Sequence, residues 1–187
     1  VLNRAMAALQ IESPDGAGLM KSYIYDHGND PSVTTAGLYL GDHFFFKKNF
    51  VEAIDSYKLV NTNKLPIENQ AEVLFKQGYS HFQLNQYGQA APYFDAGKAL
   101  NQPASFDSYY YSGFIAMENG NTDKAIADLQ TASQSPYYEN KVPYLLAALY
   151  YKQGSYDQLI SFAEPRLTSG QNLEKRDVIY LYLAEAY

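Results

Sequence analysis

The sequence predicts an all-α protein built of stacked helix–turn–helix repeats, and three observations lead to that prediction. A small residue that follows a short aromatic or aliphatic run recurs at intervals of 34 to 37 residues. A Gly- or Asn-rich stretch, suited to ending one helix and starting the next, follows it in four copies. The 187 residues and the 47% apolar fraction suit one compact domain or one repeat array. Repeat periods of this size indicate a solenoid.

The first 33 residues are the least regular part. Residues 1–11 are typical of an apolar-rich helix, 14–16 of a turn, and 17–27 of a second helix, which the breaker residues 28–31 then end. This pattern predicts a degenerate N-terminal helical repeat over 1–33. The alternative is a disordered leader.

The regular array is expected over 34–187, with the last repeat truncated after its first helix. In each copy the small residue should let the first helix of the hairpin approach the second closely; these small residues are Gly41, Gly78, Gly113, Ala147 and Ala184. Four short turns should join the two helices of a hairpin, where Gly and Asn tolerate a left-handed backbone: Lys48-Asn49, Asn85-Gln86, Asn119-Gly120-Asn121 and Gln153-Gly154-Ser155.

Several residues predict where helices begin and end. Asp107 and Thr122 are expected to be N-caps, and Pro143 fits a first helical turn. Pro165 is interpreted as the one internal helix breaker. A proline inside a regular helix costs around 3 kcal/mol, so we expect that helix to kink or end near Glu164.

These features together resemble the tetratricopeptide repeat (TPR) family, and the phrasing of the last repeats is similar to TPR proteins of the bacterial envelope. A fair match to the family pattern runs through Tyr109, Gly113, Ala116, Gly120, Ala125, Leu129, Ala132 and Pro136. The resemblance implies a right-handed α-α superhelix of about five hairpins. It also implies a protein–protein interaction scaffold whose first helices line a concave groove.

Carried over position by position, the resemblance implies a set of groove-facing residues. The partner-binding set is Asp42, Phe45, Phe46, Tyr79, Gln83, Tyr110, Phe114, Met117, Glu118, Tyr144, Tyr151 and Lys152. The same carry-over adds Leu38, Phe75, Phe82, Ala148, Leu181 and Glu185, and it places Tyr109 and Tyr180 in buried positions.

Two interpretations of these aromatics stay open. They could pack between neighbouring repeats, which is favoured for Phe75, Phe82 and Phe114. They could instead line the groove for a peptide, because Tyr gives a large contact area at low entropic cost. This interpretation is favoured for Tyr79, Tyr110, Tyr144 and Tyr151. TPR domains that grip a C-terminal carboxylate use basic and Asn side chains at these positions. The aromatics here therefore predict apolar or aromatic partner segments, bound with little salt dependence.

Composition and missing motifs exclude several classes of function. The formal net charge of −6 argues against nucleic acid as a partner. The absence of Cys removes disulfides and thiolate chemistry, and the three His show no metal-ligand spacing. No phosphate-binding loop or nucleophile elbow is present, and no apolar run approaches the roughly 20 residues of a membrane span. We therefore expect no enzyme activity, cofactor, metal site or membrane insertion.

The sequence thus predicts a non-catalytic scaffold that binds a protein or peptide and belongs to a larger envelope-associated protein. The expected location is periplasmic or outer-membrane-associated, and otherwise cytoplasmic. Two alternatives remain. The array could be a self-assembly module that forms a homo-oligomer through its uncapped C-terminal helix. It could also be the regulatory repeat region of an enzyme or receptor whose active domain lies elsewhere.

Overall fold

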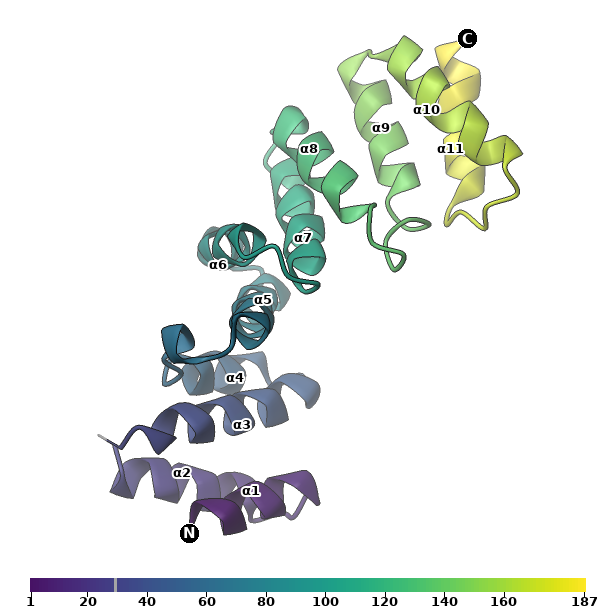
Figure 1. Ribbon diagram of the computed structural model, residues 1–187. Coiled ribbons are helices and arrows are strands. Elements are labelled where there is room, and N and C mark those ends of the chain that lie inside the picture. The colour runs from purple at the N-terminus through teal and green to yellow at the C-terminus, as the bar shows by residue number, and fades with distance from the viewer. Residues whose placement is uncertain (29) are drawn as a thin grey trace. The chain divides into compact units, whose positions relative to one another are not determined.

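The structure is a computed structural model that describes residues 1–28 and 30–187. Over those residues the chain forms α-helices, one short 3-10 turn and no strand, so the all-α prediction is confirmed (Figure 1). The helices are α1 (Leu2–Gln10), α2 (Gly16–Asp26), α3 (Ser32–Phe46), α4 (Phe50–Tyr57), α5 (Ile67–Gln83), α6 (Tyr87–Ala99), α7 (Ser105–Glu118), α8 (Thr122–Ala132), α9 (Pro143–Gln153), α10 (Tyr156–Thr168) and α11 (Arg176–Ala186), and the 3-10 turn is η1 (Thr62–Lys64).

Consecutive helices pair as hairpins: α1 with α2, α3 with α4, α5 with α6, α7 with α8, and α9 with α10, after which α11 follows (Figure 1). The chain divides into two compact units, Val1–Gln102 and Pro103–Tyr187. In the first unit α3 contacts both α1 and α5, and in the second α9 contacts α11. The odd-numbered helices α1, α3 and α5 are therefore successive neighbours in the first unit, and α9 and α11 are neighbours in the second.

Close approach of the two helices within a hairpin depends on the small residues that the sequence singled out. A Cβ atom added at Gly41 would lie 2.5 Å from the ring of Tyr57, and one at Gly78 would lie 2.7 Å from the ring of Phe94. At Gly113 the distance to Leu129 would be 2.8 Å. Side chains do not tolerate such distances, so the prediction is confirmed for these three hairpins.

The turns that join the helices are left-handed at one residue, as expected. That residue is Lys48, Asn85, Gly120 or Gly154, with φ between 57° and 73°. In the first of these turns Lys48, rather than Asn49, takes the left-handed conformation. Asn49 instead caps α4 by accepting a hydrogen bond from the Glu52 backbone N–H.

Two of the predicted N-caps are wrong by one to three residues. The cap of α8 is Asn121, whose side chain accepts from the Lys124 N–H, and Thr122 is the first helical residue. Asp107 lies inside the first turn of α7, which begins at Ser105. Pro143 does begin α9, as expected.

Proline does not end the helices that contain it. α10 continues through Pro165 to Thr168, so an end near Glu164 is wrong, and the alternative of a kink there stays a prediction. The Arg166 guanidinium donates to the Phe162 carbonyl at 2.8 Å, and the Thr168 hydroxyl donates to the Glu164 carbonyl at 3.0 Å, so side chains support this final stretch. Pro165 is also not the one internal breaker, because Pro92 lies within α6.

Each unit has its own apolar core. In the first unit, one cluster joins α1, α2 and α3 through buried residues such as Leu9, Met20 and Leu40, and a second surrounds Tyr57. In the second unit a single cluster runs from α7 to α11. Tyr180 does not belong to it: its side chain is 49% exposed, and the neighbouring Ile179, at 1%, takes the buried position instead.

The N-terminal residues form two helices, α1 and α2, that pack against each other. Asn29, part of the predicted break at 28–31, lies outside the described residues. α3 begins at Ser32, two residues before the expected start of the array. That residues 1–33 are a degenerate repeat stays a prediction.

Candidate partner-binding surface

Aromatic side chains gather where α3, the start of α4 and α5 meet. We call Phe45, Phe46, Phe50, Phe75 and Tyr79 the α3–α5 aromatic cluster. The ring of Phe45 lies 5.6 Å from that of Tyr79 and 6.2 Å from that of Phe50, and the rings of Phe50 and Tyr79 are 5.9 Å apart. Phe46 is 73% exposed, whereas the other four are half-buried. The cluster is thus packed at its base and open to solvent at Phe46.

Asp42 fixes one side of this cluster. Its carboxylate accepts a hydrogen bond from the Tyr57 hydroxyl at 2.6 Å and pairs with the Lys76 ammonium at 2.8 Å. Burial, followed by the charge of Asp42, raises the pKa of Tyr57 far above its usual range, so this phenol stays a donor. The same ammonium lies 5.6 Å from the Phe46 ring. Asp42 therefore orients Lys76 and Tyr57 as well as facing solvent.

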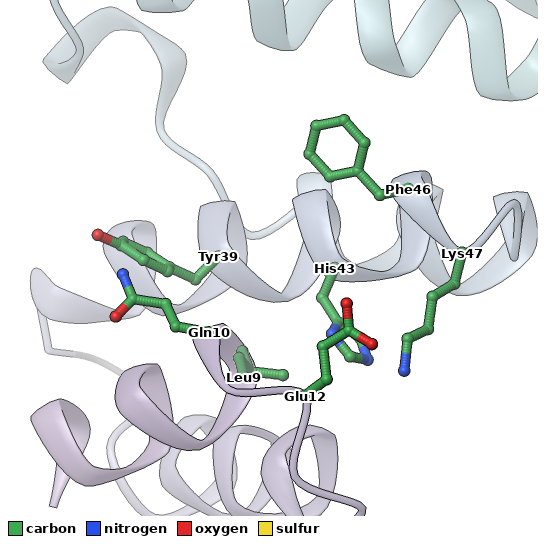
Figure 2. A pocket seen from close by; sticks show the side chains of 7 residues that line it. All are labelled: Leu9, Gln10, Glu12, Tyr39, His43, Phe46 and Lys47. Atoms are coloured by element: carbon green, nitrogen blue, oxygen red, sulfur yellow. The ribbon is translucent and has the colours of Figure 1, made fainter.

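A pocket of about 180 Å³ lies between α1 and α3 and reaches the rim of this cluster. We call it the α1–α3 pocket; it is lined by Leu9, Gln10, Glu12, Tyr39, His43, Phe46 and Lys47. Figure 2 shows Tyr39 and Gln10 at one end and the polar ends of Glu12, His43 and Lys47 gathered at the other. Phe46 projects from the opposite side of α3.

Burial, followed by the Lys47 charge, favours the neutral form of His43. Burial lowers the pKa of His43, the Lys47 ammonium lowers it further, and the Glu12 carboxylate opposes both effects. At neutral pH the imidazole therefore has one ring nitrogen free to accept a hydrogen bond. The pocket then contains one fixed negative charge, at Glu12, and one fixed positive charge, at Lys47.

In the second unit, tyrosines surround Tyr110 on α7. Its ring stacks on that of Tyr138 at 4.6 Å and 17°, and the Tyr138 hydroxyl donates to the Asp107 carboxylate at 2.6 Å. Burial raises the pKa of Tyr110, and nearby Tyr144 raises it further. The Lys175 ammonium lies 4.4 Å from the Tyr144 ring. The loop between α8 and α9, which carries Tyr138, is thus anchored to α7 through Tyr110 and Asp107.

A second group of aromatics joins α9 to α11. The ring of Tyr151 lies 5.0 Å from that of Tyr182 and 5.9 Å from that of Tyr156. A hydrogen bond to Glu185 raises the pKa of the Tyr151 phenol. Lys152, next in sequence, is exposed.

All twelve residues of the predicted partner-binding set retain contact with solvent. The exposed members are Phe46, Gln83, Glu118 and Lys152, and the half-buried ones are Asp42, Phe45, Tyr79, Tyr110, Phe114, Met117, Tyr144 and Tyr151. The structure brings Phe45, Phe46 and Tyr79 together in the first unit. That the set forms one groove for a partner stays a prediction.

Sequence reasoning missed Phe50, Tyr138 and the α1–α3 pocket. Phe50 and Tyr138 lie outside the first helices, so the repeat pattern gives them no groove position. Glu12 had a usable signal: it is an acidic residue directly after a predicted helix, where Gly, Asn or a basic residue is usual.

Candidate metal sites and membrane-spanning helices are both absent from the part of the chain that the structure describes. No group of three or more His, Cys, Asp or Glu residues there is placed to hold a metal ion. None of its helices combines the length and the apolar character that crossing a membrane requires.

Comparisons with known proteins agree with this architecture. A family model described as "Tetratricopeptide repeat" matches residues 75–139. Two crystal structures of MamA superpose with a TM-score of 0.62; they are 20% and 23% identical, and the matches cover 91% and 84% of this chain and 84% and 91% of those chains. BtubC (BKLC) from P. vanneervenii superposes with a TM-score of 0.63 at 15% identity, covering 100% of this chain and 83% of that one. No curated protein sequence matches the chain.

Proposed function

Given that the chain is a tetratricopeptide repeat protein with a superhelical all-α repeat fold, we propose that it is a non-catalytic scaffold that binds another protein or peptide on its odd-numbered helices. The observation that carries the proposal is the α3–α5 aromatic cluster. Phe46 keeps 73% of its surface in water beside rings that are already packed. An exposed aromatic side chain beside well-packed aromatic rings is well suited to a binding hot spot.

The chemistry of this surface favours an apolar or aromatic segment of the partner. The Phe rings give contact area, and the Tyr79 hydroxyl can hydrogen-bond the partner's backbone. Lys76 is held by Asp42, so it does not act as a free anion receptor. We expect no grip on a C-terminal carboxylate at this position, in agreement with the sequence.

Site-specific photocrosslinking in the native cell tests the proposal. A benzoylphenylalanine placed at Phe46 should crosslink a defined protein, because this exposed side chain stands at the rim of the cluster. The matched control is the same probe at Tyr25 on α2, which is 89% exposed and outside the cluster. Equal crosslinking at both positions, or none at Phe46, would refute the proposal.

Self-assembly is a second candidate function, and the exposed face of α11 favours it. Leu181 is 56% exposed and Tyr180 49% exposed. A pocket of about 480 Å³ between α10 and α11 is lined in part by Pro165, Leu167 and Leu183. A second copy seated there would make the mass from light scattering rise with concentration, and Leu181→Glu would abolish the rise. A constant monomer mass would exclude self-assembly.

An envelope location is also part of the proposal. It is supported by the absence of Cys, which suits an oxidising compartment, and by 19 Tyr in a chain with only 18% charged residues. Fractionation of native cells into cytoplasm, periplasm and outer membrane, followed by immunoblotting, tests it. Recovery in the cytoplasmic fraction alone would refute it.

A further inference from the structure

We propose that the α1–α3 pocket is a subsite for a basic side chain, and that it takes an arginine presented by the protein partner. The inference rests on the proposed function, because the partner supplies the arginine. It adds a polar specificity element to a surface whose other contacts are aromatic. Four observations lead to it: the position of Glu12, its lack of a partner, the neighbouring acceptors and the size of the pocket.

Glu12 occupies a position that folding alone disfavours. It follows α1 with φ at 53°, and its N–H donates to the Leu9 carbonyl at 3.1 Å while Ser13 N–H donates to Ala8 at 2.9 Å. The left-handed backbone penalises any side chain, and the negative end of the helix dipole penalises a carboxylate. At the same turn in the other hairpins the residues are Lys48, Asn85, Gly120 and Gly154.

The Glu12 carboxylate acts electrostatically on His43 but has no bonded partner that would explain it. Throughout the described chain it makes neither an ion pair nor a side-chain hydrogen bond. Lys47, the other charged residue of the pocket, is different, because it is the C-cap of α3, where a positive charge is favourable. The fold therefore explains Lys47 and leaves Glu12 unexplained, and residues held against their preference tend to serve function.

The groups around Glu12 offer acceptors that suit a guanidinium. His43 is neutral, since burial and Lys47 lower its pKa, so one ring nitrogen can accept. Gln10 adds an amide carbonyl and Tyr39 a hydroxyl at the other end of the pocket (Figure 2). Guanidinium has five N–H donors and no acceptor, and Leu9 gives its aliphatic stem an apolar wall. A carboxylate ligand would meet the Glu12 charge instead.

Size and overall charge agree with this assignment. At about 180 Å³ the pocket is smaller than the roughly 300–1,000 Å³ of small-molecule sites, so it suits one side chain rather than a free metabolite. The net charge of −6 attracts a basic partner toward the chain.

Titration of the full chain with model compounds, followed by NMR at pH 7.5, tests the inference. N-acetyl-argininamide should shift the His43 ring signals and the backbone amide of Glu12. Its neutral isostere N-acetyl-citrullinamide should bind at least tenfold more weakly, because it lacks the charge that pairs with Glu12. Glu12→Gln should weaken binding of argininamide at least tenfold. The matched control Glu68→Gln makes the same charge change at an exposed site on α5 and should leave binding unaltered.

Three outcomes would overturn the inference: equal binding of the two isosteres, tighter binding of the α-amide of N-acetyl-glutamate, or weaker binding of argininamide to Lys47→Met. The second would show that the pocket selects anions through Lys47. The third would contradict a cation site, because Lys47→Met removes a repelling positive charge and should strengthen argininamide binding. Glu12→Asn guards against misfolding, because Asn suits the left-handed turn. This variant should melt at a higher temperature and still lose the argininamide response.

The experiment separates this inference from the proposed function. The model compounds probe the pocket without the partner, whereas photocrosslinking at Phe46 probes partner binding without arginine chemistry. A negative titration with positive crosslinking refutes the arginine subsite alone. Positive titration with no crosslinking refutes the scaffold surface and leaves a cation pocket.

Discussion

Ser108 is a polar residue at a buried position that is apolar in the other repeats. Ser108 on α7 is fully buried, and its hydroxyl has no hydrogen-bond partner among the residues that the structure describes. The corresponding positions hold Ala36 in α3, Val73 in α5 and Val142, the N-cap of α9. An apolar residue is the rule at this position, so the Ser108 hydroxyl was desolvated on folding without compensation.

We predict that Ser108→Ala stabilises the protein by about 1 kcal/mol, because it removes an unsatisfied buried hydroxyl. Urea unfolding followed by circular dichroism measures the change. The matched control is Ser80→Ala, also fully buried, whose hydroxyl donates to the Lys76 carbonyl at 2.7 Å. The control should lose stability by about 1 kcal/mol. A loss in both variants would contradict the assignment of Ser108.

His43 should make the first unit sensitive to acid. Its pKa in the folded chain is lowered from the usual value, chiefly by burial. The unfolded chain therefore binds the proton more readily, and stability present above about pH 6.5 falls as the pH drops toward the folded pKa. His43→Phe should reduce the fall in melting temperature between pH 7.5 and pH 5. Parallel pH profiles for the two proteins would rule out His43 as the cause.

At the scale of a helix, close packing inside a hairpin depends on glycine at one position. Gly78→Ala should destabilise the protein by about 1–3 kcal/mol, because the new Cβ would lie 2.7 Å from the buried ring of Phe94. Gly88→Ala on α6 is the control, since its Cβ would meet no atom within 4 Å. That change should stabilise the helix by about 0.5–1 kcal/mol. The melting temperatures of both variants test this prediction. Equal changes in melting temperature would exclude a steric role for Gly78.

Sequence predicted helix pairing better than helix ends. The small residues and their large partners define three of the hairpins, because this contact repeats in those copies and needs no long-range information. The expected helix end at Pro165 was wrong because the penalty of a missing N–H depends on what else supports the turn, and the Arg166 and Thr168 side chains do so here. Tyr180 was misplaced by one residue, which on a helix moves a side chain by about 100°.

The candidate site, too, was predicted only where its residues follow the repeat pattern. The repeat pattern identified Phe45, Phe46 and Tyr79, because they lie on the faces of consecutive first helices. It could not identify Tyr138 or Phe50, which reach the same surfaces from a loop and from the start of a second helix. Sequence thus predicts what a repeat shares and misses what one loop adds.

At the scale of the molecule, each unit should respond to damage in its own core. Leu129 in the second unit and Phe94 in the first are both fully buried. Leu129→Ala should cost about 2–5 kcal/mol, because it leaves a cavity in the cluster that runs from α7 to α11. In a repeat protein, stability is approximately a sum of local terms. Amide hydrogen exchange should therefore accelerate mainly in residues 103–187.

Phe94→Ala is the reciprocal variant, and it should accelerate exchange mainly in residues 1–102. Two contrasting exchange maps would mean that the units open separately and that a partner held on the α3–α5 aromatic cluster stabilises the first unit alone. Uniform acceleration over both units in both variants would instead demonstrate a single cooperative fold. Binding at that cluster would then also protect α7 to α11, which the same experiment with the crosslinked partner would measure.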